Sequence, residues 1–356
     1  MRPGSGRYIR RMAQPDKQAD SNPGRDRLKL LGLIHGYWIS QVVRAAADLR
    51  LAEHLADGPL TAAQVAAIES SDPAATYRLM RACLGVGLLS DDGDGRFGVT
   101  PLGALLREGA PGSLRDTALV FGAPAHWLTW GQLPAAVRTG ESRAAAALGA
   151  DLFDYLASQP AEAAQFSGSM AELTSANATD AANVIDVAGG SLAVDVGGAT
   201  GELVRALLRA NPGLHGMVLD LPQAASAAEQ AAREDGLGDR FTGVPGDFFA
   251  SVPAADLYLL KAVLHDWDDA SCLKILRNCR EAARPGARLM VIENVILDPA
   301  RDRFASLLDL NMLVVTTGQE RELAAYDELF AASGWKRTAI HPLSGGRSLL
   351  ELQAAG

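Results

Sequence analysis

The segment from residue 192 to residue 210 constrains the fold of this chain more than any other. An apolar run, residues 192–196, leads into the turn Gly197-Gly198-Ala199-Thr200-Gly201, and a helical stretch, residues 202–210, follows the turn. A buried strand, a glycine turn and a helix in this order are typical of the ligand-binding edge of an open α/β sheet. The sequence therefore predicts such a sheet, with a ligand at this turn.

Short apolar runs alternate with alanine-rich helical stretches in the second half of the chain. Residues 216–219, 257–264 and 288–292 are the further predicted strands. This alternation predicts an α/β fold, with a mostly parallel, doubly wound, Rossmann-like sheet over residues 183–356. The run 257–264 ends at His265-Asp266-Trp267-Asp268-Asp269. Because strand carboxyl ends collect catalytic groups in such sheets, we expect His265 in an active site.

Composition narrows the class of partner. The chain has 356 residues, 48% of them apolar, and a formal net charge of −9, which argues against nucleic acid or an anionic membrane as the main partner. Its three cysteines form no CxxC pair, and no apolar run approaches the ~20 residues that span a bilayer. Residues 1–25 are basic without an apolar core, so we predict a disordered tail rather than a signal peptide. A cytoplasmic enzyme with a small-molecule substrate fits these features.

The first half predicts a helical domain with a winged helix over residues 26–120. Apolar side chains recur every three or four positions from Leu28 to Leu49, which predicts a first helix buried in its own domain or against a second subunit. A capping box at Thr61, a cap at Asp72 before Pro73, and turn residues 91–95 between two short strands give the order helix, helix, hairpin. Residues 51–120 hold nine acidic and five basic residues, so a scaffold or dimer surface is favoured over DNA binding. Residues 121–182 are predicted to form a helical linking and substrate region.

Acidic residues at two later strand ends indicate the kind of cofactor. The glycine turn lacks the last glycine of G-x-G-x-x-G, and the residue there, Glu202, would repel a pyrophosphate. The next strand ends in Asp220, which can accept hydrogen bonds from a ribose diol, and a third strand end carries Asp247 and Phe248, which suit an adenine. Each acid alone is more often a cap or turn residue. Together the three strand ends predict a nucleoside cofactor without phosphates.

These motifs resemble those of class I S-adenosylmethionine-dependent O-methyltransferases of the plant caffeate type, especially the bacterial branch that tailors aromatic antibiotics such as anthracyclines and mitomycin. The resemblance rests on four segments, residues 195–201, 219–222, 246–249 and 261–267, and extends from about residue 28 to the end of the chain. It implies a winged-helix dimerisation domain, a homodimer, S-adenosyl-L-methionine as cofactor, and a small aromatic or polyketide-type substrate whose hydroxyl is methylated.

The resemblance also assigns cofactor contacts. Gly197 would contact the methionine part, Asp220 the ribose, Asp247 and Phe248 the adenine, and Lys261 the methionine carboxylate. Met170 and Thr174 would approach from the helical region. One departure is Ala199, where the family often has glycine. The full predicted cofactor set is Asp195, Gly197, Gly198, Asp220, Leu221, Asp247, Phe248, Lys261, Met170 and Thr174.

Methylation of a phenol needs a base, because a phenol with a pKa near 10 is mostly protonated at neutral pH, and histidine suits this role. The resemblance implies that His265 is the base, that Glu293 holds the imidazole tautomer and raises its basicity, and that Glu320 assists from a loop. The alternatives are that His265 is an ordinary hydrogen-bonding residue and that Glu320 forms a surface pair with Arg321.

His265 with its neighbouring acids also permits a metal site. No second histidine lies near Asn311, so we expect no metal, and Asp268 or Asp269 should instead cap the helix predicted over residues 270–283.

The substrate pocket is expected between the helical region and the sheet ends, where rings and thioethers suit a flat aromatic substrate. Ordinary core packing is the alternative for each of its residues. Two other functions remain open: a hydroxylase or decarboxylase of the same fold that binds the same cofactor, and a winged-helix regulator. The predicted lining residues are Trp127, Phe153, Phe166, Met170, Trp267, Asn311 and Met312.

Overall fold

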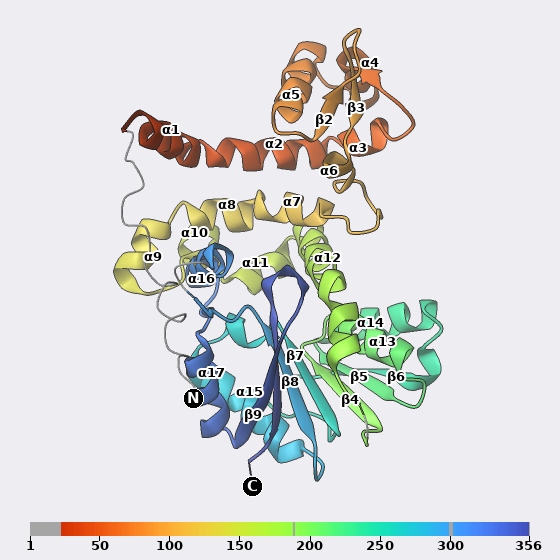
Figure 1. Cartoon of the computed structure of the whole chain (residues 1–356), viewed down its shortest axis with the longest axis vertical. Helices are drawn as coiled ribbons and strands as arrows, with labels where there is room; N and C mark the ends of the chain where they lie inside the picture. Colours follow the sequence, from red (N-terminus) through yellow and green to blue (C-terminus); the bar gives the residue numbers. More distant parts are fainter. Residues whose placement is uncertain (1–22, 188, 299–301, 356) are drawn as a thin grey trace, which may run out of the picture.

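The computed structural model describes residues 23–187, 189–298 and 302–355, with the side chains of residues 174–177 left out. Its elements form three tiers along the long axis: a winged-helix tier, a helical tier, and an α/β sheet (Figure 1). The predicted tail lies outside the described residues up to residue 22, and helix α1 already begins at Pro23. Within the described part of the chain, no helix is long and apolar enough to cross a membrane.

The sheet has seven strands in the order β6-β5-β4-β7-β8-β10-β9. Strands β4 to β8 are parallel, and β10 runs antiparallel to both of its neighbours. The predicted mostly parallel, doubly wound sheet is confirmed, whereas the C-terminal antiparallel hairpin was not predicted. The strands are β4 (Leu192–Val196), β5 (His215–Asp220), β6 (Phe241–Pro245), β7 (Leu257–Lys261), β8 (Arg288–Glu293), β9 (Trp335–Pro342) and β10 (Ser348–Ala354).

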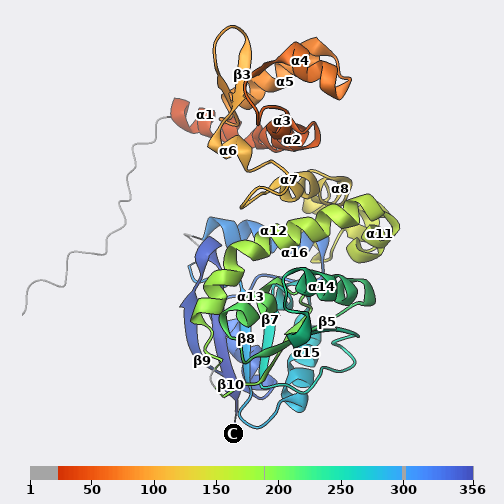
Figure 2. The same ribbon diagram turned by 90° about the vertical axis from the view of Figure 1, so that its right-hand side faces the viewer.

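Both faces of the sheet are covered, which explains why its central strands β4, β7 and β8 are mostly apolar. On one face α12 (Pro160–Val184), α13 (Glu202–Ala210) and α14 (Pro222–Glu234) bury a core around Leu207 and Val218. On the other face α15 (Asp269–Ala282) and α17 (Leu323–Ala332) bury a core around Tyr258 and Trp335. Figure 2 shows α12 running from the helical tier down onto the sheet. Short 3-10 turns are η1 (Gly238–Arg240), η2 (Leu264–Asp266) and η3 (Ser344–Gly346).

Strand β7 ends earlier than predicted. The sequence predicted a strand to Leu264, but β7 ends at Lys261 because Ala262 has a left-handed backbone with φ of 52°. The chain then enters the short turn η2, which contains His265. An apolar run alone cannot reveal this bend, since Val263 and Leu264 are buried in the turn as they would be in a strand.

The N-terminal tier is a winged helix. Its sheet has the order β1-β3-β2, and the predicted caps are present, with the Thr61 capping box starting α4 and Asp72 capping α5. The predicted first helix is divided at His35, where ψ is 0°, into α1 (Pro23–Ile34) and α2 (Gly36–Asp48). The remaining elements are α3 (Leu51–His54), β1 (Leu60–Thr61), α4 (Ala62–Glu69), α5 (Pro73–Gly85), β2 (Leu89–Asp91), β3 (Arg96–Val99) and α6 (Pro101–Ala104).

The middle tier is helical, as predicted for residues 121–182, and it also receives α16 (Arg303–Val315) from the C-terminal half (Figure 1). A core around Leu152 and Val314 joins these helices. The other helices are α7 (Arg115–Phe121), α8 (Pro124–Trp130), α9 (Leu133–Thr139), α10 (Ala144–Leu148) and α11 (Leu152–Ser158).

Substitutions at two residues of the glycine turn should differ in their effect on the free energy of unfolding. Ala199 (φ 48°) is an exposed L-residue in the left-handed region, whereas Gly201 (φ 72°) is surrounded, and a Cβ there would lie 2.9 Å from Val218 Cγ2. We expect Gly201→Ala to lower the free energy of unfolding by about 2 kcal/mol, from backbone strain and overpacking. Ala199→Gly should change it by less than about 1 kcal/mol, because relief of strain offsets the added freedom of the unfolded chain. Urea denaturation of both variants checks this; equal losses would contradict it.

Candidate active site

The histidine selected from the sequence is buried at the carboxyl end of the sheet. His265 lies in η2 after β7, with two glutamates beside it. Its Nδ1 lies 2.7 Å from Glu320 Oε1 and 3.9 Å from Glu293 Oε2. Asp266 Oδ1 lies 3.7 Å from Nε2. The Nδ1 contact leaves Nε2 as the nitrogen that can accept a proton from a bound molecule.

The roles of the two glutamates differ from the prediction. Glu320, not Glu293, makes the hydrogen bond to the imidazole. Glu293 Oε1 instead accepts hydrogen bonds from the backbone N–H groups of Val263 and Leu264, at 3.1 and 2.9 Å. These two N–H groups follow Ala262, the left-handed residue at which β7 ends. Glu293, at the end of the adjacent strand β8, is therefore their partner. Glu293 therefore holds the turn that carries His265, and Glu320 orients the ring.

The loop that carries Glu320 is fixed against the histidine turn. The Glu320 N–H donates to Asp309 Oδ1 at 3.0 Å, and a Cβ on Gly318 would lie 1.8 Å from the carbonyl oxygen of His265, so only glycine allows this approach. Arg321 is 2% exposed and donates to the carbonyl oxygens of Leu264 and Trp267. The alternative of a surface pair between Glu320 and Arg321 is therefore wrong.

Charge around the imidazole sets its protonation. Burial by itself disfavours the charged ring, but the negative charges of Glu293 and Asp266 and the hydrogen bond to Glu320 outweigh it and raise the pKa of His265 to about 9. Burial also raises the pKa of Glu293. In the free protein the imidazole is thus mostly protonated at neutral pH, and the fraction able to accept a proton rises with pH. A positive charge bound nearby lowers this pKa.

The acids beyond His265 have structural partners. Asp268 Oδ1 accepts from the Ser271 N–H at 2.8 Å and caps α15, as predicted, and Asp269 binds Arg321 at 2.7 Å. One potential metal-ligand atom of each of His265, Glu293 and Glu320 lies within 4.8 Å of the others, so one metal ion could bind all three residues. An Nδ1–H that donates to Glu320 would have no lone pair left for a metal.

The predicted cofactor turn meets the ends of two other strands. A Cβ on Gly197 would lie 3.0 Å from Val263 Cγ2 and 3.5 Å from Phe248 Cε1, so the turn, the Phe248 ring and the histidine turn converge. Asn278 on α15 donates to the Phe248 carbonyl oxygen at 2.7 Å and fixes that segment. Gly197 has a positive φ of 70° and no side chain, so its backbone can approach Val263 and the Phe248 ring closely.

The two acids predicted to bind the nucleoside are accessible. Asp220 is half-buried, and its carboxylate accepts from the N–H groups of Ala199 and Leu221 at 2.8 and 2.7 Å. Asp247 is exposed and accepts from the Phe249 N–H at 2.8 Å. Each carboxylate is thus held by the backbone and retains lone pairs for a ligand. Leu221 is 64% exposed beside them.

Two further predicted cofactor residues, Asp195 and Lys261, lie near the carboxyl ends of β4 and β7. Asp195 is buried under the turn, where a Cβ on Gly198 would come within 2.6 Å of its Cγ, and burial raises its pKa to about 7. Burial and the charge of Arg347 lower the pKa of Lys261 to about 7, while Asp195 and Glu293 oppose this shift. Asp195 therefore supports the turn from below, and the charge of Lys261 interacts with those of Asp195 and Glu293. Met170 and Thr174 lie on α12, and the Thr174 side chain is outside the described part.

The predicted substrate residues lie on the helices α8, α11, α12 and α16 and, for Trp267, directly after η2. Phe153 and Phe166 form a T-shaped pair with centroids 6.4 Å apart, whereas Trp267 packs on Phe248 and Phe249 near the cofactor turn. Trp127 is 39% exposed, and its ring lies 6.2 Å from that of Tyr37 on α2.

Asn311 and Met312 are buried on α16, and the sequence did not single out their neighbour Trp130. The Trp130 indole N–H donates to Asn311 Oδ1 at 2.7 Å, which fixes the amide orientation. A separation of 181 residues along the chain hides this pair from sequence patterns.

Comparison with known proteins agrees with this arrangement. A family model of the O-methyltransferase domain matches residues 130–336, and one of the O-methyltransferase dimerisation domain matches residues 31–109. A phenazine O-methyltransferase from Lysobacter antibioticus is 36% identical over 323 residues, which cover 90% of this chain and 94% of the relative.

Two solved structures are also similar. The mitomycin 7-O-methyltransferase structure has a TM-score of 0.87 at 34% identity and covers 94% of this chain and 99% of that one. An O-methyltransferase from neocarzinostatin biosynthesis, in complex with S-adenosylmethionine and 2-hydroxy-5-methyl naphthoic acid, has a TM-score of 0.77 at 38% identity and covers 89% of this chain and 96% of that one. With its buried histidine beside a cofactor turn, and with both family models matched, this chain belongs to the S-adenosylmethionine-dependent O-methyltransferases that carry an N-terminal dimerisation domain.

Proposed function

We propose that this protein methylates a hydroxyl of a small aromatic or polyketide-type natural product, with His265 as general base. The observation that carries the proposal is the buried His265–Glu320 pair, whose Nε2 remains available beside the cofactor turn. The relatives support the acceptor class, since the phenazine enzyme is named for an aromatic acceptor and the neocarzinostatin enzyme was solved with a naphthoic acid.

The proposed chemistry divides between cofactor and chain. When bound, S-adenosylmethionine supplies a methyl group on a positively charged sulfur. Neutral His265 takes the proton of the acceptor hydroxyl at Nε2, Glu320 stabilises the resulting imidazolium, and Glu293 keeps the ring-bearing turn in place. The acceptor oxygen then forms its bond to the methyl carbon as the carbon–sulfur bond breaks, and the proton leaves from His265 to solvent. Positioning of the two reactants supplies most of the remaining acceleration.

The cofactor is proposed to lie along the turn at Gly197 and Gly198 and across Asp220, Asp247 and Phe248, with Leu221, Lys261, Met170 and Thr174 around it and Asp195 below it. The acceptor is proposed to bind between the helical tier and the sheet ends. Asn311, whose amide is oriented by Trp130, and Met312 supply the buried part of that site. Trp127, Phe153, Phe166 and Trp267 remain proposed contacts.

A pair of acceptors tests the proposed base. An aromatic amine is a nucleophile without losing a proton first, whereas a phenol depends on the base. His265→Ala should therefore slow methylation of a phenolic naphthoate far more than methylation of the matched amino-naphthoate. Equal losses for the pair would contradict base-assisted O-methylation, and product analysis by mass spectrometry measures both.

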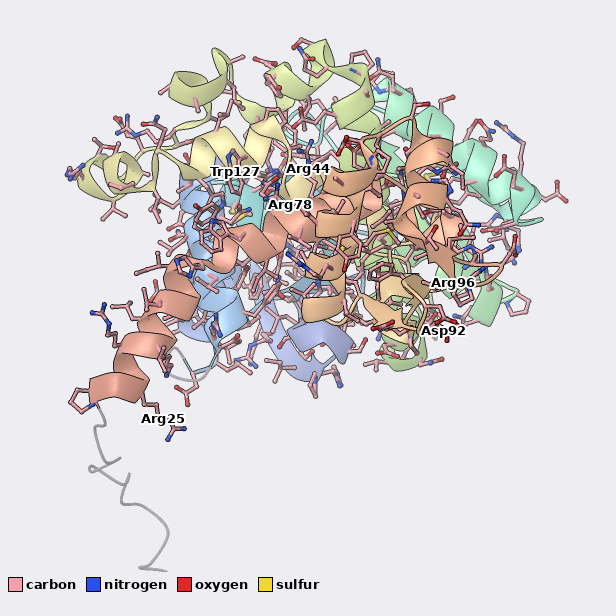
Figure 3. All side chains as sticks on the ribbon, turned by 90° about the horizontal axis from the view of Figure 1, so that it is seen from above. Arg25, Arg44, Arg78, Asp92, Arg96 and Trp127 are labelled. Atoms are coloured by element: carbon pink, nitrogen blue, oxygen red, sulfur yellow. The ribbon has the colours of Figure 1, made fainter. Side chains whose placement is uncertain are left out.

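We also propose a cytoplasmic homodimer, formed through the dimerisation domain, with domain limits at residues 26–120, 121–182 and 183–356. Cys83, Cys272 and Cys279 are buried free thiols, which suits a reducing compartment. Large apolar side chains of α1 and α2 are exposed, among them Leu33 (59%) and Trp38 (53%). Seen from above, these helices run diagonally across the molecule, and the end of α1 near Arg25 extends beyond the parts below it (Figure 3). A continuous apolar face of this kind marks a subunit interface.

Charge placed on this face should separate the subunits. Light scattering should give wild type twice the 37.4 kDa of one chain, and Leu33→Glu with Trp38→Glu should give a monomer, because two buried carboxylates oppose association. Ile68→Glu is the matched control, since Ile68 is 56% exposed on α4, outside α1 and α2. A monomeric wild type, or a dimeric double variant, would contradict the proposal.

A further inference from the structure

An arginine at the carboxyl edge of the sheet has no partner for its charge. Arg347 follows the turn η3 and precedes β10, and its backbone is extended, with φ of −80° and ψ of 156°. The residue is half-buried, and its Nη1 atom is fully buried. Among the described residues this nitrogen has no hydrogen-bond partner, and the guanidinium forms no ion pair. A buried cationic donor without an acceptor is costly, so a local reason for it is expected.

A second unpaired donor lies across from this arginine. Strands β8 and β10 pair antiparallel up to Glu293 and Ser348. Continuing this pairing by one residue brings Asn294 opposite Arg347. Asn294 is 2% exposed, and its amide nitrogen is also buried without a partner among the described residues. Two nitrogen donors that lack acceptors therefore follow the last paired residues of these strands.

Arg347 lies on the face of the sheet that α12 covers. Leu349, two residues further along β10, is buried in the core that α12 shares, and side chains two positions apart on a strand point to the same face. By the same rule Lys261 shares this face with Leu259. Lys261 and Leu349 both pair with Ile292 of β8, so they form one row across the sheet. Arg347 is about 7 Å beyond this row along its strand.

The turn that carries Arg347 is fixed to α12. The Ser344 N–H donates to Asp180 Oδ2 on α12 at 3.3 Å, and the Leu343 N–H donates to the Arg347 carbonyl oxygen at 2.8 Å. Figure 1 shows this turn, between β9 and β10, rising beside the helical tier. The arginine is thus presented next to the helix that carries two proposed cofactor contacts, Met170 and Thr174.

The charge of Arg347 acts on two neighbouring strand ends. Burial, and next the charge of Arg347, lower the pKa of Lys261 to about 7. Burial raises the pKa of Glu293, and the charge of Arg347 is among the causes that oppose this shift. Glu293 does not neutralise the arginine by contact, because it uses Oε1 for the histidine turn and forms no ion pair with Arg347. Two cations on one face of the sheet edge favour an anion between them.

We propose that Arg347 and Asn294 form a carboxylate-binding site at the edge of the sheet, next to Lys261. This rests on the proposed position of the reactants at this edge. A guanidinium presents its N–H groups in a fork that matches the two oxygens of a carboxylate, and the amide of Asn294 adds a further donor. Two proposed reactants carry this group: the methionine part of the cofactor, and an acceptor that is an aromatic acid. Because Lys261 is proposed at the methionine carboxylate, we expect that carboxylate to be the occupant.

Ligands with and without a carboxylate test the site without turnover. Arg347→Gln should raise the Kd of the demethylated cofactor about tenfold or more, because a charged hydrogen bond is lost, and should leave the Kd of its decarboxylated analogue unchanged. Arg347→Lys retains the charge without the fork and should lie between glutamine and wild type. Asn294→Leu should give a smaller loss, again only for the ligand with the carboxylate. Calorimetry measures all four proteins.

Arg337→Gln is the matched control, since Arg337 lies on β9 and its guanidinium binds Asp327 at 2.7 Å. It should leave both affinities unchanged. Urea denaturation of the unliganded Arg347→Gln variant should show no loss of stability, because the guanidinium has no partner to lose. An equal loss of affinity for the ligands with and without a carboxylate would overturn the proposal and leave Arg347 a structural residue.

A second pair of molecules identifies the source of the carboxylate. If an acceptor supplies it, Arg347→Gln should raise the KM of a hydroxynaphthoic acid about tenfold and leave the KM of the matching naphthol unchanged. No carboxylate-dependent change in either pair would refute the site. A carboxylate-dependent loss of binding in a protein that methylates no acceptor would refute the proposed function and retain the site, whereas methylation without any carboxylate-dependent loss would refute the site alone.

Discussion

Replacing His265 with alanine should lower kcat by about 10²- to 10⁴-fold, the usual contribution of a general base, and leave the affinity for S-adenosylmethionine nearly unchanged. The imidazole lies in the turn after β7 with Nε2 available, whereas the proposed contacts to the ribose and the adenine lie at the ends of β5 and β6. Steady-state kinetics with a phenolic acceptor and calorimetry with the cofactor measure the two effects separately.

His341→Ala is the control, because His341 is half-exposed on β9 in the same sheet. It should retain wild-type turnover. A loss below about tenfold for His265→Ala, or an equal loss of cofactor affinity, would show that His265 is not the base.

Asp220→Ala should weaken cofactor binding by about 1.5 to 3 kcal/mol, which corresponds to roughly a 10- to 150-fold higher Kd. The carboxylate is held by the N–H groups of Ala199 and Leu221, so it is presented to a ribose diol without having to reorganise. Calorimetry with S-adenosylmethionine and with its demethylated product should give the same loss, since both carry the ribose.

Asp239→Ala removes an equal charge from η1 and should leave both affinities unchanged. Asp220→Asn retains one acceptor oxygen and should lie between alanine and wild type. An unchanged Kd for Asp220→Ala would place the ribose elsewhere.

Local patterns predicted most of the fold. The glycine turn, the capping residues Thr61 and Asp72 and the strands β4, β5 and β8 follow from short-range chemistry, and the structure has them within a few residues. The predictions that were wrong concern backbone bends inside apolar runs. Neither the break at His35 nor the left-handed Ala262 changes the periodicity that a sequence displays.

The sequence predicted which residues form the site more fully than how they are arranged. The family pattern placed His265, Glu293 and Glu320 together. Which glutamate bonds to the imidazole depends on which loop reaches Nδ1. The loop of Glu320 reaches it because Gly318 allows a close approach to the His265 carbonyl oxygen. Trp130 carries no local signal, because an aromatic residue on a helix is typical of a core until the partner of its polar atom on a distant element is known.

At this site we expect a methyl group to move from the cofactor to an acceptor oxygen. The most direct test incubates the protein with S-adenosylmethionine labelled in its methyl group and a panel of phenolic polyketides and small aromatic acids, and follows both acceptor and cofactor by mass spectrometry. We expect the gain of one labelled methyl on a hydroxyl, with one cofactor demethylated for each product formed. A product that has gained an oxygen or lost carbon dioxide, with the cofactor unconsumed, would contradict it.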